Sequence, residues 1–390
     1  MQITRFATPL LATLAALSAV TSRAAPAVTE SLWGTMPDGR PVRLFTLTND
    51  LKTRVVLAEY GALLVSVETA DQEGRVGQVT LSYRSFEEAL GGGVLGSVIG
   101  RFANRIGGGG FTIDGKRYDL QSVNKDGIHI HGGDTGFHRQ LWTGVAGADS
   151  RSARAVFSLA SPDGHEGYPG KVAVSVTYSL TNDNCLRLEY AGSTDRPTHL
   201  NLTNHVYFNL AGSGDIRSHV LEMTCDHVLA IDPHKVPTGR LLDVAKTPFD
   251  FRIAKLVGRD LATIEGGGYD HCFVIPRGKD PLVPFARLWD PSTGRTLAMA
   301  TTMPGVQVFT SNSFKGTPFP RWGGICFETQ FYPDTPNRPE FPTSLLRPGE
   351  TYRHITEFLF GVQRTDRPVG SDGLEDRSQS VPIEGSARPL

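Results

Sequence analysis

The chain has no excess of charge of either sign. Its 390 residues contain 39 Lys and Arg against 40 Asp and Glu, which leaves a formal net charge of −1. Nucleic acids and anionic membranes are captured by patches of positive charge, so a balanced chain gives no reason to expect either partner. A small, uncharged ligand fits this composition better.

Long apolar runs are also scarce, and the most extended one lies at the N-terminus. Residues 7–20 are almost entirely apolar, Arg5 precedes them, and Ser22 and Ala24 supply small residues where a signal peptidase cleaves. This pattern predicts a secretory signal peptide over residues 1–24 and a periplasmic or secreted mature protein. The alternative is a membrane anchor, but the run is short for a bilayer span of about 20 residues.

Cysteine is rare as well, at four residues in the whole chain. Cys185, Cys225, Cys272 and Cys326 fall in segments that resemble strands, without the close spacing of a zinc site. An exported protein can form disulfides, but a chain of this size buries a core without them. We therefore predict buried free thiols.

Long amphipathic helices and fixed-period repeats are missing, and short strands take their place. Larger apolar side chains alternate along residues 171–180, and residues 186–190 resume the alternation after a turn. Residues 285–289 and 295–300 form a second hairpin pattern. The only helical signal is Ser85–Leu90, where Ser85 is a suitable cap. The pattern predicts an all-β fold, a large antiparallel β-sandwich.

The domain organisation follows from the same pattern. No linker interrupts the strand signals, so residues 30–363 are predicted to form one domain, and the polar segment 365–390 a disordered tail. The oligomeric state is not determined, because sheet edges can be covered by loops or by a second copy.

Polar residues gather in a segment that otherwise has the pattern of a half-buried strand. Residues 201–210 place His205 among three asparagines and two aromatic rings. Buried polar side chains need hydrogen-bond partners, and a hydroxyl-rich ligand would provide them. A neutral sugar is the expected ligand, and a core histidine is the alternative for His205.

Four further residues stand in polar clusters. Arg105 follows Asn104 in a segment that ends in glycines but lacks the Lys-Ser/Thr of a P-loop, so it is either a hydroxyl donor or a surface residue. Asp270 is either a turn residue or a ligand for a hydroxyl pair. Glu328 interrupts an apolar strand, where a half-buried general base and a structural salt bridge are equally compatible with the spacing.

A metal site is considered for His129 and His131. Two histidines at i and i+2 lie on one face of a strand, but a metal site needs a third ligand and no nearby carboxylate is evident. We therefore predict no metal.

Read in order, these clusters resemble the aldose 1-epimerase (galactose mutarotase) family over roughly residues 32–362. Further motifs support the resemblance and occupy residues 162–170, 237–239, 247–251, 304–307 and 346–352. The resemblance implies a galactose mutarotase-like supersandwich with a sugar groove on one sheet. It also implies interconversion of the α and β anomers of free aldoses, with no metal and no other cofactor.

The resemblance also implies roles for individual residues. Glu328 matches the family's general base and His205 its general acid. The positions that match sugar-binding residues are Asn104, Arg105, His131, Asp270 and Gln307. Two departures, Val206 and Phe331, stand where many relatives have serine and histidine, and are expected to affect substrate preference. With ordinary pKa values of about 4.3 and 6.5, the glutamate would be ionised near neutrality and the imidazole would supply a proton.

Three alternatives are compatible with the same groove. A non-catalytic sugar-binding protein would not need both Glu328 and His205. A sugar-phosphate mutarotase would need extra cations around the phosphate. A glycosidase normally uses two carboxylates, where the matched pair here is a glutamate and a histidine.

Overall fold

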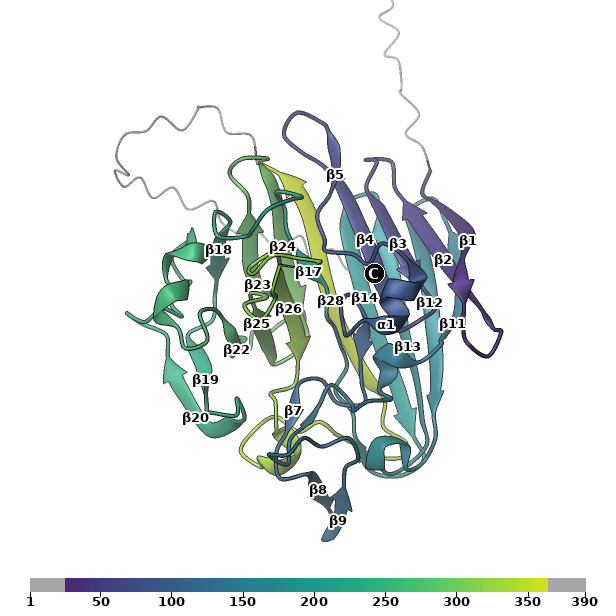
Figure 1. The fold of residues 1–390 in the computed structure, drawn as a ribbon, viewed down its shortest axis with the longest axis vertical. Helices are drawn as coiled ribbons and strands as arrows, with labels where there is room; N and C mark the ends of the chain where they lie inside the picture. Colours follow the sequence, from purple (N-terminus) through teal and green to yellow (C-terminus); the bar gives the residue numbers. More distant parts are fainter. Residues whose placement is uncertain (1–24, 317, 364–390) are drawn as a thin grey trace, which may run out of the picture.

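The computed structural model describes residues 25–316 and 318–363, and antiparallel sheets dominate them. The largest sheet has nine strands in the order β11-β12-β13-β14-β28-β24-β23-β18-β21. In Figure 1 the yellow strand β28 lies between the teal and the green strands of this sheet. The nine strands of this sheet are β11 Thr143–Ala148, β12 Ser152–Ser161, β13 Val172–Thr181, β14 Cys185–Thr194, β18 Val220–Met223, β21 Lys255–Leu256, β23 Val283–Trp289, β24 Arg295–Thr301 and β28 Tyr352–Val362.

Two further sheets cover the nine-stranded sheet. One has six strands in the order β17-β26-β25-β22-β19-β20, and the other runs β1-β2-β3-β4-β5. The six strands are β17 Tyr207–Phe208, β19 His227–Ile231, β20 Pro237–Asp243, β22 Asp270–Val274, β25 Gly305–Phe309 and β26 Ile325–Gln330. The five are β1 Ala27–Thr35, β2 Pro41–Thr48, β3 Arg54–Ala58, β4 Leu63–Ala70 and β5 Val76–Gln78.

Short elements connect these sheets. Two-stranded pairs are made by β6 Val98–Ile99 with β16 Thr203–Asn204, β7 Arg105–Ile106 with β10 His129–Ile130, β8 Gly110–Ile113 with β9 Lys116–Asp119, and β15 Thr198–His199 with β27 Leu345–Leu346. The 3₁₀ turns are Phe137–Arg139, His165–Gly167, Val257–Arg259, Leu261–Thr263 and Thr335–Asn337.

One hydrophobic cluster fills the space between the layers. Phe45 of β2 meets Phe157 of β12 edge to face, with ring centroids 5.5 Å apart. Phe208 of β17 meets Phe358 of β28 at 5.1 Å. Because aromatic side chains bury large apolar areas, these contacts join the two smaller sheets to the nine-stranded sheet. The predicted β-sandwich is confirmed.

The segments with apolar alternation of period two form the hairpins that the sequence predicted. Strand β13 alternates buried with more exposed residues along Val172–Thr181 and pairs with β14, while β23 pairs with β24. The α-helix α1 spans Phe86–Gly91, and the Ser85 side chain accepts the N–H of Glu88, as the cap predicted. No helix in the described part of the chain is long and apolar enough to cross a bilayer.

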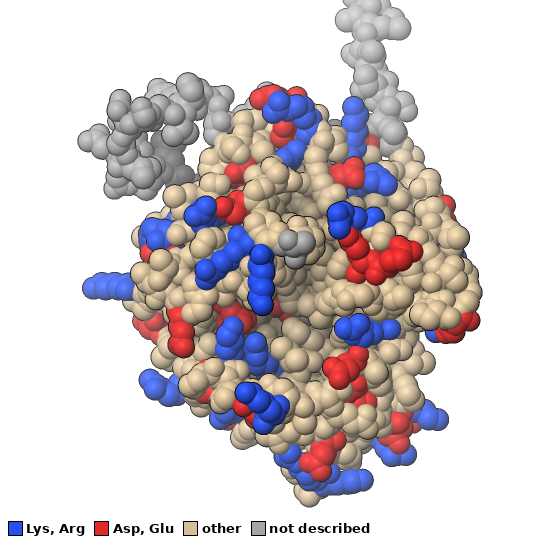
Figure 2. Space-filling view, viewed as in Figure 1, with Lys and Arg blue, Asp and Glu red and all other residues tan. Residues whose placement is uncertain are grey.

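The four cysteines are free, as predicted. Three are buried, Cys185 is half-buried, and Cys225 lies just after β18 rather than in a strand. The surface carries charges of both signs intermixed over the face in Figure 2, consistent with the balanced composition. The predicted signal peptide and tail lie outside the described residues, and the single-domain assignment remains a prediction.

The prediction of a half-buried strand over residues 201–210 was wrong. All ten residues are buried, and only β16 and β17 within them have strand geometry. The three asparagines of the segment hydrogen-bond loops elsewhere in the chain, whereas Oγ1 of Thr203 and Oδ1 of Asn204 have no partner among the described residues.

Candidate functional site

Three neighbouring strands of the six-stranded sheet present polar side chains on one face. The register places Gln307 of β25 opposite both Cys272 of β22 and Glu328 of β26. Side chains two residues apart share a face of a strand, so Asp270 and Cys326 belong to this face as well. The sheet thus places a carboxylate on each of two strands, with an amide on the strand between them.

The central feature is a buried pair of Glu328 and His205. The glutamate is 2% exposed, and its Oε1 lies 3.5 Å from Nε2 of His205. Its Oε2 has no hydrogen-bond partner among the described residues, which leaves an acceptor free for a ligand. Glu328 is therefore fully buried rather than half-buried, and the titratable group beside it is an imidazole.

Burial changes the protonation of this pair. Burial raises the pKa of Glu328 to about 8, and the negative charge of Asp270 adds to the rise while Arg105 opposes it. Burial lowers the pKa of His205 to about 4. At neutral pH the resting pair therefore holds a protonated carboxyl and a neutral imidazole. The expectation of ordinary pKa values was wrong, because it left out desolvation.

His131 joins the pair from a loop. Its ring meets that of His205 edge to face, with centroids 5.3 Å apart. Strand β10 ends at Ile130, and His131 has a left-handed φ of 52°. The two histidines therefore do not share a strand face as predicted, and His129 instead bonds the carbonyl of Gln121 at 2.7 Å.

Asn104 positions its neighbours on both sides. Its backbone N–H donates to Nδ1 of His131 at 3.2 Å. Its side-chain oxygen accepts from the N–H of Arg105 at 3.0 Å and from Nη1 of that arginine at 3.2 Å. The amide side chain thus orients the Arg105 guanidinium toward the site.

A second group surrounds Asp270. Its carboxylate accepts from Nε2 of Gln307 at 2.7 Å and from Nζ of Lys235 at 2.5 Å, and Nη2 of Arg105 lies 3.6 Å away. Burial would raise the pKa of Asp270, but Arg105 and Lys235 hold it below its ordinary value. Lys235 was not among the predicted residues, because it stands 35 residues before its partner with no motif around it.

Three side chains come close enough to hold a metal ion. One ligand atom each from His131, His205 and Glu328 lie within 4.8 Å of one another. However, the N–H of Asn104 occupies Nδ1 of His131, so the neutral ring carries its hydrogen on Nε2. A ring nitrogen that carries hydrogen cannot ligate a metal, and it suits a hydroxyl or ring oxygen instead.

The asparagines around His205 bind the protein rather than a ligand. The side chain of Asn201 accepts the N–H of Phe331 at 2.9 Å, Asn204 donates to the carbonyl of Gly96 at 2.8 Å, and Asn209 donates to that of Gly323 at 2.9 Å. They hold the loops beside the site. Within this polar cluster, the side chain that pairs with Glu328 is the imidazole of His205.

The two departures from the family motif pack against apolar and aromatic neighbours. Val206 is 1% exposed in the main hydrophobic cluster, and the Phe331 ring stands edge-on to His354 at 5.3 Å. Their expected effect on substrate preference stays a prediction.

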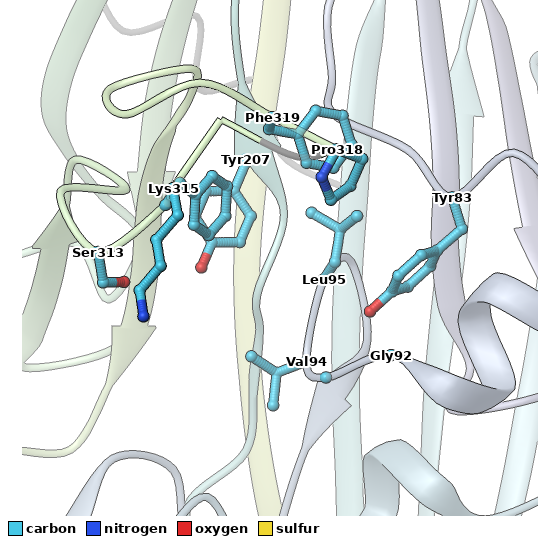
Figure 3. Close-up of a pocket in the computed structure, with 11 residues that line it drawn as sticks. Tyr83, Gly92, Val94, Leu95, Tyr207, Ser313, Lys315, Pro318 and Phe319 are labelled. Carbon is cyan, nitrogen blue, oxygen red and sulfur yellow. The ribbon is translucent and has the colours of Figure 1, made fainter.

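A cavity of about 470 Å³ lies beside Tyr207, and neither Glu328 nor His205 lines it (Figure 3). The Tyr207 ring forms part of its wall and stacks on the other side against His205, with centroids 5.0 Å apart. Its wall is mainly apolar, and its polar side chains include Tyr83 and Lys315. Tyr207 thus connects this cavity to His205, while none of the seven predicted site residues lines it.

A galactose mutarotase-like β-sandwich with a buried Glu–His pair on one sheet face defines a class of acid–base site. Comparison with known proteins makes the assignment specific. The model of the family described as aldose 1-epimerase matches residues 43–359. The chain belongs to the aldose 1-epimerase family.

Relatives match over nearly their whole length. The chain is 40% identical to galactose mutarotase of Homo sapiens over 346 residues, which is 86% of this chain and 99% of the relative. It is 37% identical to aldose 1-epimerase of Escherichia coli over 343 residues, 83% and 96% of the two chains.

Solved structures agree. Galactose 1-epimerase from Lactobacillus acidophilus superimposes with a TM-score of 0.78 at 28% identity, covering 87% of this chain and 99% of that one. A GalM/aldose epimerase homologue from C. elegans superimposes with a TM-score of 0.73 at 28% identity, covering 80% of this chain and 97% of that one.

Proposed function

We propose that this protein is an aldose 1-epimerase that interconverts the α and β anomers of free aldoses, with galactose among its substrates. The relatives named galactose mutarotase support the substrate class. The observation that carries the proposal is the buried pair of Glu328 and His205, with an acceptor and a donor 3.5 Å apart.

The reaction needs one proton removed and one delivered. The Glu328 carboxylate takes the proton of the hydroxyl on C1 while Nε2 of His205 delivers a proton to the ring oxygen, and the bond between C1 and the ring oxygen breaks. The open aldehyde turns about the C1–C2 bond. Closure on its other face returns both protons, so the enzyme is unchanged and anomers are exchanged.

The resting pair already holds the proton that this step requires. A protonated Glu328 beside a neutral His205 carries the same number of protons as a carboxylate beside an imidazolium. Transfer between Oε1 and Nε2 converts the first state into the second without exchange with solvent. Because His205 lies within a water-poor site, the imidazolium is a strong acid there.

The remaining predicted residues bind the sugar in this proposal. His131 donates from Nε2, since its Nδ1 is occupied by Asn104. Arg105, Asp270 and Gln307 form a connected group that offers donors and acceptors to ring hydroxyls. Because these side chains already hydrogen-bond one another, they are preorganised. Sugar binding therefore loses little free energy in ordering them.

The replacement Glu328→Gln tests the proposal. It keeps the size of the side chain but removes the base, so the rate of anomer exchange should fall by about 10²-fold or more. The measurement is polarimetry on freshly dissolved α-galactose. Glu357→Gln is the matched control, because Glu357 lies on the nine-stranded sheet and pairs with Arg187. Undiminished exchange by the Glu328 variant would refute the assignment.

The alternatives have less support. A glycosidase would need a second free carboxylate, whereas Asp270 is held by Lys235 and Gln307. A sugar-phosphate enzyme would need free cations, and Arg105 and Lys235 both face Asp270. Sugar binding without any acceleration of anomer exchange would favour a non-catalytic binding protein.

Export is a second part of the proposal. The segment 1–24 is proposed to be a cleaved signal peptide, and the mature enzyme to act in the periplasm or outside the cell. N-terminal sequencing of the protein from fractionated cells should give Ala25 as the first residue. A full-length chain in the cytosolic fraction would contradict export without affecting the enzymatic assignment.

A further inference from the structure

The two imidazoles in the site differ in what bonds their Nδ1 atoms. Nδ1 of His131 accepts from the backbone N–H of Asn104 at 3.2 Å. Nδ1 of His205 lies 3.2 Å from Sγ of Cys326. One partner is an amide and the other is a thiol, and this difference has chemical consequences.

A backbone amide can only donate. Nδ1 of His131 must therefore stay without hydrogen, and the ring is held as a neutral donor through Nε2. A thiol both donates and accepts. Sγ of Cys326 can accept the hydrogen of Nδ1 both while His205 is neutral and while it is an imidazolium, so Nε2 is the nitrogen that gains and loses the proton. Of the two rings, only His205 has a partner compatible with both protonation states.

The strand geometry brings the thiol to this place. Cys326 stands two residues before Glu328 on β26, so both side chains leave the same face. Across the ladder Cys326 pairs with Tyr207 of β17, whose ring stacks on His205. Tyr207 also hydrogen-bonds the Cys326 side chain. A sulfur atom has two lone pairs, so Sγ can accept from this phenol and from Nδ1–H of His205 at the same time.

Burial keeps the sulfur in its thiol form. Cys326 has no exposed surface, and burial raises the pKa of its thiol well above the ordinary value, an effect that the charge of Glu328 increases. The negative charge of a thiolate beside Nδ1 would stabilise the imidazolium and oppose release of its proton. The thiol leaves the imidazole free to gain and lose a proton.

We propose that Cys326 is a positioning residue for the anomer exchange: its thiol holds the His205 ring with Nε2 toward Glu328 and permits the ring to cycle between neutral and protonated forms. The proposal rests on the proposed function. It also explains why His205, and not His131, is the proton donor, since the amide on His131 forbids the second proton.

Kinetics of three variants test this role. Cys326→Ala removes the partner, so kcat should fall about tenfold while KM for galactose stays within about twofold. Cys326→Ser keeps a group that donates and accepts, and should recover kcat to within about threefold of the wild type. Cys225→Ala is the matched control, a buried cysteine outside the site, and should leave kcat unchanged.

Ring ¹⁵N NMR of histidine-labelled protein gives a readout that packing alone would not change. In the wild type near pH 7, His205 should be neutral with hydrogen on Nδ1 and none on Nε2, with the signal assigned through His205→Gln. In Cys326→Ala the ring should populate both tautomers. Thermal melting of each variant separates this effect from loss of folding.

The outcomes are distinct. The backbone of His205 also bonds its own ring, and if that contact alone held it, Cys326→Ala would keep the wild-type kcat and tautomer, which would overturn the proposal. Hydrogen on Nε2 and none on Nδ1 of neutral His205 in the wild type would overturn it too, even if Cys326→Ala did not fold. A wild-type protein without mutarotase activity would refute the proposed function, while the NMR result would still decide the thiol contact.

Discussion

At the scale of single residues, desolvation decides how this site is protonated. Glu328 and His205 are 2% and 4% exposed, and each is driven toward its neutral form. Their pKa values are therefore in reverse order compared with free side chains, with the carboxyl at about 8 and the imidazole at about 4. Between these values the pair holds one mobile proton.

The pH dependence of kcat/KM follows from that proton. Below about pH 4 His205 gains a proton while Glu328 keeps its own, so no base remains. Above about pH 8 Glu328 loses its proton while His205 stays neutral, so no acid remains. We expect a plateau between limbs near pH 4 and pH 8, measured by polarimetry with circular dichroism as a check on folding. A decline that begins near pH 6.5 would indicate an ordinary imidazole instead.

Asp270→Asn tests the coupling between the two polar groups of the site. The charge of Asp270 is one cause of the raised pKa of Glu328, so its removal should lower that pKa and move the alkaline limb below pH 8. The variant also leaves Lys235 without its carboxylate partner, and KM for galactose should rise about tenfold. Initial rates across pH measure both effects.

The control for this variant is Asp183→Asn. Asp183 lies exposed in the turn between β13 and β14 on the nine-stranded sheet. Its replacement should change neither the alkaline limb of the pH profile nor the KM for galactose. An alkaline limb that stays in place in Asp270→Asn would show that the two carboxylates are not coupled.

At the scale of elements, the hairpins and the capped helix follow from local sequence, but the site segments do not. The pattern over β13 and β14 is set by neighbours two residues apart. His131 and the asparagines near His205 depend instead on loops distant in sequence. Asn201 reaches Phe331, 130 residues away, and no local pattern predicts such a contact.

The loop that carries His131 requires glycine at position 132. Gly132 has a φ of 81°, and a Cβ there would lie 1.9 Å from the carbonyl oxygen of Gly100. We expect Gly132→Ala to lower the free energy of unfolding by about 3 kcal/mol, from backbone strain and overpacking together. Mutarotase activity should fall as well, because His131 is displaced.

Gly108→Ala is the matched control. Gly108 also has a positive φ, 63°, but a Cβ there has nothing within 4 Å. It should cost about 1 kcal/mol of strain and leave the activity intact. Equal losses in urea unfolding for the two variants would show that the contact with Gly100 does not matter.

At the scale of the whole molecule, a shared core joins the three sheets. The main cluster contains Phe45 of β2, Leu188 of β14 and Phe327 of β26, all at most 1% exposed. No layer can be separated without exposing apolar surface, so we expect one cooperative thermal transition by scanning calorimetry. Two separated transitions would contradict the predicted single domain over residues 30–363.

The sequence by itself determined the sandwich and the chemical types at the site. Alternation with period two is a local property, and the order of the polar clusters was enough to reveal the resemblance to the family. Six of the seven predicted side chains face one another in two connected groups, and the seventh, Asn104, orients two of them.

Only the tertiary structure decided how those residues act. Lys235 opposite Asp270 and the thiol against His205 arise where distant strands and loops meet. The depth of burial, which reverses the protonation of Glu328 and His205, depends on all the layers packed around them. Desolvation is a property of the surrounding volume rather than of neighbours along the chain, so spacing could name the acid and the base but not their charges.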